Sequence, residues 1–471
     1  MGKKQTDWTS TLGRDKLSID DSANESTSSF AEKDMDELYL CMLVEHAKIT
    51  EEIKNTILDH ATDVLAIFYI GSWAHKEMSY TVEDGHVSFL NDIDVLVVTK
   101  KKMTRDEVKA LRDETSRAIN PNYIEYEDYV KMEGFHNLYV DIRSISIAEL
   151  TGITPRIKYY DIFTDPSIVY LRDSDDHDLL PKIELEDIPL TDGLVHLFNR
   201  MALLVEWQPS LIKQDKTLII LVLKAYSAIL EALLLLQKRY VVPLREKVKV
   251  FHEIYEHEFD ELHAALPDLA NRLDRMVDMK VNFGKYYPEI GTKDILDIWN
   301  GAREDSIIVT IYMINAIYKT NFGLSTDAEN TLQILKFLEK KNGFVVNHYV
   351  RHHIKKHGIR LPKPLMPLTY LGIRYLYFSK FSEFNGSSRF SKTMCKSLRS
   401  TKEPTSVLYL TILSLLAGIA YSKDEVRRNE LLVSLADDYL TQISINGQGY
   451  PDTLTKFREV FRIWELFTFE R

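Results

Sequence analysis

The chain contains the stretch DIDVLVV at residues 92–98, in which two acidic residues lead into a continuous apolar run. Successive side chains of a β-strand point to opposite faces of the sheet, so Asp92 and Asp94 are predicted to share one face while Ile93 and Val95 point into the core. Two carboxylates placed about 6.6 Å apart along a strand can hold a pair of Mg²⁺ ions about 3.5–4 Å apart. The stretch therefore predicts a strand that begins at a metal site.

The apolar run LAIFYI at residues 65–70 precedes this stretch and is closed by Gly71. A short continuous apolar run of this kind is typical of a buried strand. Ser72 is expected to cap a helix over residues 72–78. Glycine lets the backbone approach a phosphate closely, and a helix N-terminus binds anions. Gly71 and Ser72 are therefore predicted to form a phosphate-binding turn.

Two short alternating segments, residues 80–82 and 86–89, lie between this turn and the acidic pair. They flank Glu83-Asp84-Gly85, which is a typical hairpin turn sequence. A hairpin here accounts for the long gap between Ser72 and Asp92, which lie twenty positions apart.

A third carboxylate, Asp141, stands between Val140 and Ile142 in another strand-like run. A charge between two apolar strand residues needs a partner or a metal, because burying it alone is costly. Asp141 is therefore the candidate third metal ligand. In a phosphoryl-transfer site it would bind the metal ion that activates the attacking hydroxyl of the acceptor, and would accept the proton of that hydroxyl.

Gly71, Ser72, Asp92, Asp94 and Asp141, in this order, resemble the pattern of the DNA polymerase β-like nucleotidyltransferase superfamily. The resemblance covers roughly the segment from position 60 to 150, and the gap before the acidic pair is longer than usual. It implies a magnesium-dependent enzyme with two Mg²⁺ ions, for which Mn²⁺ could substitute. Such an enzyme moves a nucleoside monophosphate from an NTP, with ATP as the first candidate, to an acceptor hydroxyl and releases pyrophosphate. The segment 159–197 also looks like a poorly characterised prokaryotic branch of these enzymes.

In this superfamily a helix usually carries a lysine that contacts the triphosphate. Lys224, within the apolar run 218–236, is the candidate for this nucleotide-binding role, and a lysine that extends to solvent from an amphipathic helix is the alternative. For Asn199 and Arg200 the sequence favours a capping role or an ion pair over nucleotide contact.

The predicted fold class is α+β: a nucleotidyltransferase-type mixed sheet with covering helices, followed by a large all-α region. The expected divisions are a disordered segment 1–33, a catalytic domain 34–185, a helical domain 186–325, and a C-terminal helical domain or continuation of the same domain 326–471. Helical patterns cover positions 192–207, 215–237, 245–277, 304–319, 328–340, 405–421 and 423–443.

Composition predicts a cytoplasmic protein without a membrane segment. The chain has 471 residues, a net charge of −11 and two cysteines, so a disulfide framework is not expected. The run 218–236 is long enough to span a bilayer, but Lys224 and Glu231 would be costly there, and a buried helix is the preferred interpretation. The acidic total charge argues against a surface that coats nucleic acid.

The acceptor stays open, with a small molecule, a protein side chain, an RNA end and a nucleotide as alternatives. A basic region at 336–402 could contact nucleic acid or polyphosphate, although a solvated basic face explains it equally well. Within the histidine-rich segment 347–358, Arg351 and His357 resemble the Arg-x(4–6)-His pattern of HEPN-type ribonucleases. The alternative function is therefore a ribonuclease or toxin-type helical module regulated by a nucleotide-binding domain.

Overall fold

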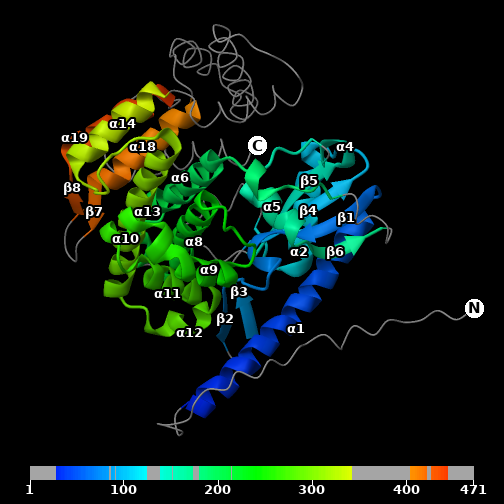
Figure 1. Cartoon of the computed structure of the whole chain (residues 1–471). Helices are drawn as coiled ribbons and strands as arrows, with labels where there is room; N and C mark the ends of the chain where they lie inside the picture. Colours follow the sequence, from blue (N-terminus) through cyan, green and yellow to red (C-terminus); the bar gives the residue numbers. More distant parts are fainter. Residues whose placement is uncertain are drawn as a thin grey trace, which may run out of the picture.

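The structure is a computed structural model that describes residues 28–83, 86–90, 92–124, 138–150, 152–172, 180–213, 215–341, 404–421 and 426–443. The chain forms a mixed α/β part, followed by a region composed mainly of helices. Figure 1 shows the sheet with its covering helices on one side of the molecule and the mainly helical region on the other.

The sheet of the first part is mixed and has the strand order β5-β4-β1-β6. Strands β4 and β5 run parallel, and β1 pairs antiparallel with β4 on one side and with β6 on the other. The strands are β1 (Val64–Tyr69), β4 (Ile93–Thr99), β5 (Val140–Ser146) and β6 (Ser167–Leu171). The predicted apolar strands correspond to β1, β4 and β5.

Helices cover both faces of this sheet. Long helix α1 (Ser28–His60) and α2 (Arg105–Ile119) pack on one face, where Ile93, Val95 and Val97 of β4 are buried, as predicted. Helices α4 (Ile147–Leu150) and α5 (Ile157–Thr164) pack on the other face. Because side chains alternate along a strand, the two acidic residues belong to the α5 face.

The segment after β1 differs from its prediction. Gly71 has a left-handed φ of 62°, and only one 3-10 turn, η1 (Gly71–Trp73), follows. The expected helix over residues 72–78 does not form, because Lys76 also takes a left-handed φ of 57°. The hairpin prediction is confirmed by the antiparallel pair β2 (Tyr80–Glu83) and β3 (His86–Phe89).

The second part begins after η3 (Leu185–Asp187). Its helices, in chain order, are α6 (Leu190–Glu206), α7 (Pro209–Ile212), η4 (Lys216–Leu218), α8 (Ile219–Leu236), α9 (Leu244–Glu258), α10 (Asp260–Ala265), α11 (Leu269–Val281), α12 (Phe283–Tyr286), η5 (Tyr287–Glu289), α13 (Thr292–Tyr318), α14 (Ala328–Lys340), α18 (Pro404–Gly418) and α19 (Glu430–Ile443).

One hydrophobic core continues through these helices, from α6 and α8 to α18 and α19. Helix α8 lies within it. Residues 216–236 are long and apolar enough to cross a membrane, with a mean hydropathy of 2.2, but 83% of that apolar window is buried inside the molecule. The prediction of a buried helix is confirmed.

Several boundaries were predicted wrongly. Helix α1 begins at Ser28, inside the segment 1–33 that was expected to be disordered. The pattern over 245–277 is divided into α9, α10 and α11, and β6 was missed because its five residues are only partly buried. The region expected to be all-α contains an antiparallel pair, β7 (Ile419–Tyr421) and β8 (Val426–Arg428).

Candidate active site

Two of the three predicted carboxylates are neighbours on adjacent strands. Asp94 of β4 and Asp141 of β5 are direct Cα partners in the parallel ladder. Asp92 immediately precedes β4, two residues from Asp94 and on the same face. The structure therefore brings the predicted acidic residues to one edge of the sheet.

The Gly-Ser turn adjoins this edge. The N–H of Ile70 donates to the carbonyl of Asp94 at 2.9 Å, and a Cβ added to Gly71 would lie 3.9 Å from Oδ2 of Asp94. Gly71 is exposed and Ser72 is half-buried. A ligand between the turn and the carboxylates would therefore meet the Gly71 backbone, although Ser72 does not cap a helix as the sequence suggested.

Arg143 lies between two of the carboxylates. It follows Asp141 by two residues on β5, so it shares the same face of the sheet. Its Nη2 atom is 3.3 Å from Oδ2 of Asp141 and 3.6 Å from Oδ1 of Asp94. The sequence analysis missed Arg143, although the Asp-x-Arg spacing on a strand was the signal that could have found it.

Lys224 meets the third carboxylate from the helical region. Its Nζ atom on α8 is 3.5 Å from Oδ1 of Asp92, across 132 positions of sequence. Burial acts to raise the pKa of Asp92, but Lys224 and then Arg200 oppose it and leave the pKa below its ordinary value. The predicted lysine thus reaches the acidic edge, and the alternative of a lysine directed to solvent is not what the structure shows.

The pKa of Asp94 is shifted in the opposite direction to that of Asp92. Burial raises its pKa to about 7, and the neighbouring charge of Asp92 adds to this rise. Arg143 opposes the increase without cancelling it. The acidic edge therefore has room for additional positive charge.

Two further cations surround the same edge. Arg200 of α6 acts on the pKa of Asp92, as described above. Lys280 of α11 is only 7% exposed, and its ammonium makes no hydrogen bond or ion pair with any residue that the structure describes. The pKa of Lys280 is lowered to about 8, chiefly by burial; the carboxylates of Glu77 and Glu231 oppose this fall, and the charges of Lys224 and Arg200 add to it. The sequence did not indicate Lys280, because its approach depends on packing between distant helices.

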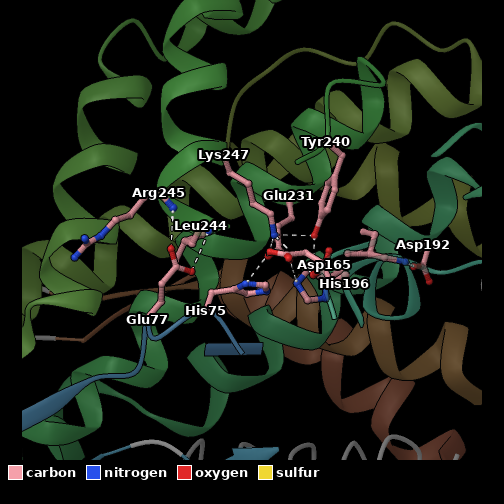
Figure 2. Close-up of polar contacts among 12 residues, drawn as sticks. His75, Glu77, Asp165, Asp192, His196, Glu231, Tyr240, Leu244, Arg245 and Lys247 are labelled. Atoms are coloured by element: carbon pink, nitrogen blue, oxygen red, sulfur yellow. Dashed lines mark hydrogen bonds and ion pairs between the residues drawn. The ribbon is translucent and has the colours of Figure 1, made fainter. Parts of the chain in front are cut away.

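A buried polar network links the two parts of the molecule (Figure 2). Lys247 of α9 is 2.8 Å from both Oε1 of Glu231 and the hydroxyl of Tyr240, and 3.8 Å from Oδ2 of Asp161. His196 of α6 contacts the other oxygen of Glu231 at 2.7 Å. The network joins α5 of the first part to α6, α8 and α9 of the second.

The segment that follows the Gly-Ser turn is also attached to the helical region. Buried Glu77 accepts hydrogen bonds from the backbone N–H groups of Leu244 and Arg245, at 3.0 and 3.1 Å, and so caps α9. The hydroxyl of Ser79 donates to the carbonyl of Lys280 at 2.7 Å. The turn beside Asp94 and the helices that carry the cations are therefore held together by direct hydrogen bonds.

The donor set of the acidic edge suits Mg²⁺, which prefers carboxylate oxygens, water and phosphate. The positively charged side chains of Arg143 and Lys224 contact these carboxylate oxygens in this structure. In this conformation no three His, Cys, Asp or Glu side chains of the described residues form a group that would hold a metal ion. Metal binding at Asp92, Asp94 and Asp141 would therefore require a rearrangement of their cationic partners.

Other predicted features lie outside the described residues. They comprise Arg351, His357, the histidine-rich segment 347–358 and most of the basic region 336–402. The ribonuclease alternative and the nucleic-acid contact therefore stay predictions.

No protein-family model and no curated protein matches the chain. Among solved structures, a spectinomycin adenyltransferase from Enterococcus faecalis, determined with ATP and spectinomycin, aligns with 58% of this chain and 99% of its own length. The identity is 14% and the TM-score is 0.32. A similarity this low does not establish a shared fold, so no residue role is transferred from that enzyme.

Proposed function

We propose that the chain is a magnesium-dependent nucleotidyltransferase that moves a nucleoside monophosphate from an NTP to an acceptor hydroxyl. The observation that carries this proposal is the convergence of separate chain segments on one edge of the sheet. Asp94 and Asp141 are paired across β4 and β5, Gly71 adjoins Asp94, and Lys224 reaches Asp92 from α8.

The carboxylates have the chemistry required for the metals. Asp92 and Asp94 would hold both ions, and Asp141 would complete the site on the acceptor side. When bound, Mg²⁺ would neutralise charge on the transferred phosphate and align the reacting oxygens. The rise of the Asp94 pKa to about 7 supports this assignment, because a divalent cation would relieve the like charge of Asp92 that contributes to the rise.

The cations of the helical region would face the triphosphate. Lys224, Arg200 and Lys280 come from α8, α6 and α11, and the ammonium of Lys280 makes no direct ion pair with the residues that the structure describes, although the charges of Glu77 and Glu231 act on it. A buried cation without a partner is costly unless a ligand supplies the opposite charge. The Gly71 backbone would approach the same phosphates, beside Asp94.

In the reaction, the acceptor oxygen attacks the α-phosphorus as the bond between that atom and the bridging β-phosphate oxygen breaks. Pyrophosphate leaves with the bonding electron pair, and the proton of the acceptor hydroxyl passes to a carboxylate, for which Asp141 is our assignment. Catalysis then depends on positioning and charge stabilisation.

The test is to incubate the protein with each α-³²P-labelled NTP and Mg²⁺, alone and with cell extract. We expect labelled product from the wild type and at least a 100-fold loss in Asp94→Asn, because removal of a catalytic charge costs about this much. Asp59→Asn, at an exposed position of α1, is the matched control. Full activity of a folded Asp94→Asn would refute the proposal.

A further inference from the structure

Arg143 is placed where it competes with a metal ion. One nitrogen of its guanidinium approaches oxygens of both Asp94 and Asp141, at 3.6 and 3.3 Å. These are two of the three carboxylates assigned above to the metals. The guanidinium and the ion therefore require the same oxygen atoms.

The side chain of Arg143 is also more exposed than those of its two partners. It is 45% exposed, whereas the side chains of Asp94 and Asp141 are 29% and 18% exposed. Its partners lie on adjoining strands that are fixed by the β4–β5 ladder. Displacement of Arg143 would consequently move a half-exposed side chain and leave the backbone of the site in place.

We propose that Arg143 is a built-in counter-cation that occupies the Asp94 and Asp141 carboxylates in the metal-free protein and is displaced when the metal enters with the nucleotide. This inference rests on the proposed function. Arginine is always charged and binds phosphate as readily as carboxylate, so the released guanidinium pairs with the negative charge of the nucleotide.

The consequence is a linkage between metal and nucleotide. Metal alone binds weakly, because it has to break the contacts of Arg143 with two carboxylates. Nucleotide favours the displaced arginine and therefore strengthens metal binding, and the same factor applies in the reverse direction. Arg143 is thus a positioning residue that makes the site respond to the metal–nucleotide complex in preference to the free ion.

The experiment is a titration of the full chain with Mn²⁺ in the absence of nucleotide. Electron paramagnetic resonance measures the concentration of free Mn²⁺ at each step, and so gives the Mn²⁺ affinity. We expect Arg143→Met to bind Mn²⁺ about tenfold more tightly than the wild type, within the usual range of coupling between sites. Arg143→Lys, which retains the charge, should stay close to the wild type. Arg117→Met removes an exposed arginine of α2 and is the matched control. Circular dichroism verifies folding, and Arg143→Gln replaces Arg143→Met if the latter does not fold.

With the α,β-methylene analogue of the transferred nucleotide present, the Mn²⁺ affinities of wild type and Arg143→Met should converge. Equal or weaker Mn²⁺ binding by the neutral variants, with binding abolished in Asp94→Asn, overturns the role of Arg143 and leaves the metal site intact. Absence of Mn²⁺ binding from every protein, with or without the analogue, overturns the proposed function and this inference together.

Discussion

Glu77 caps helix α9 by accepting the backbone N–H groups of Leu244 and Arg245 with its two carboxylate oxygens. The acceptor belongs to the segment that follows the Gly-Ser turn, and the donors belong to the helical region 167 and 168 positions away. A helix start is thus completed by a side chain from a distant part of the fold, so the cap also joins the two parts.

Substitution of Glu77 should reduce stability. Glu77→Ala leaves one buried and one partly buried N–H group without an acceptor, and we expect the free energy of unfolding to fall by about 2 kcal/mol. Glu77→Gln retains one acceptor oxygen and should lose less. Urea unfolding measures the change, with Glu253→Ala on the exposed face of α9 as the control. Equal stability of Glu77→Ala and the control would show that the cap contributes nothing.

Asp161 should make stability depend on pH. Burial raises its pKa to about 7, above the ordinary value of 3.8, and its Oδ1 atom is buried without a hydrogen-bond partner among the described residues. The folded state therefore favours the protonated acid, and the stabilisation present below pH 3.8 is lost as the pH rises through 7. Asp161→Asn stays neutral, so it should gain stability relative to the wild type between pH 5 and 8.

Thermal unfolding of both proteins at several pH values within this window measures the difference. Asp165→Asn, which changes an exposed carboxylate near the same network, is the control. A stability difference between Asp161→Asn and the wild type that does not vary with pH would contradict the assignment of this titration to Asp161.

Lys280 should strengthen nucleotide binding more than it stabilises the fold. Lys280→Met removes a buried ammonium that makes no direct ion pair in the described part of the chain, so stability should be maintained or increased. Loss of a charged contact to phosphate should weaken NTP binding about tenfold to 100-fold. Calorimetric titration with NTP and Mg²⁺ measures this, with exposed Lys285→Met as the matched control.

The same lysine predicts how nucleotide affinity varies with pH. The pKa of Lys280 is lowered to about 8, so the ammonium loses its proton as the pH rises from 7 to 9. Wild-type affinity should fall over this window, whereas Lys280→Arg should keep its affinity because arginine stays charged. Parallel pH profiles of the two proteins would exclude Lys280 as the titrating group.

Gly71 should tolerate no side chain. An alanine at its φ of 62° would be strained by about 1–2 kcal/mol, and its Cβ would stand 3.9 Å from Oδ2 of Asp94 in the path of a phosphate. We expect Gly71→Ala to lose this stability and most nucleotidyl transfer. Gly323→Ala is the control, since its Cβ would have similar space, 3.8 Å to Asn330, without a left-handed φ. Unchanged activity of Gly71→Ala would place the phosphates elsewhere.

The sequence was informative where a local pattern determines the structure. Alternation around Asp94 predicted which residues of β4 point into the core, and the turn at residues 83–85 predicted the hairpin. The pattern failed at Ser72, where helix propensity was overridden by left-handed backbone at Gly71 and Lys76 and by the tie between Glu77 and α9.

The cationic side of the site could not be predicted in this way. The bridge from Arg143 to Asp94 exists because of the β4–β5 register, and a register is a property of two strands together. Lys280 is held near the acidic edge by the hydrogen bond from the Ser79 hydroxyl to its backbone carbonyl, and these two residues lie 201 positions apart in the sequence. Lys224 was found only through a family resemblance, since a lysine in an apolar helix is equally compatible with exposure to solvent.

Helix α8 is apolar along most of its length, yet it presents Lys224 to Asp92 and Glu231 to Lys247. These two charged residues lie seven positions apart, which places them on the same side of the helix about 10.5 Å apart along its axis. A shift or rotation of α8 would separate Lys224 from Asp92 and Glu231 from Lys247, and would bring both charges towards the surrounding apolar side chains of the core. The helix therefore fixes the distance between the acidic edge and the buried network. Insertion or deletion of a single residue between Lys224 and Glu231 should preserve the helix but abolish the site, because the two charges would no longer lie on the same side.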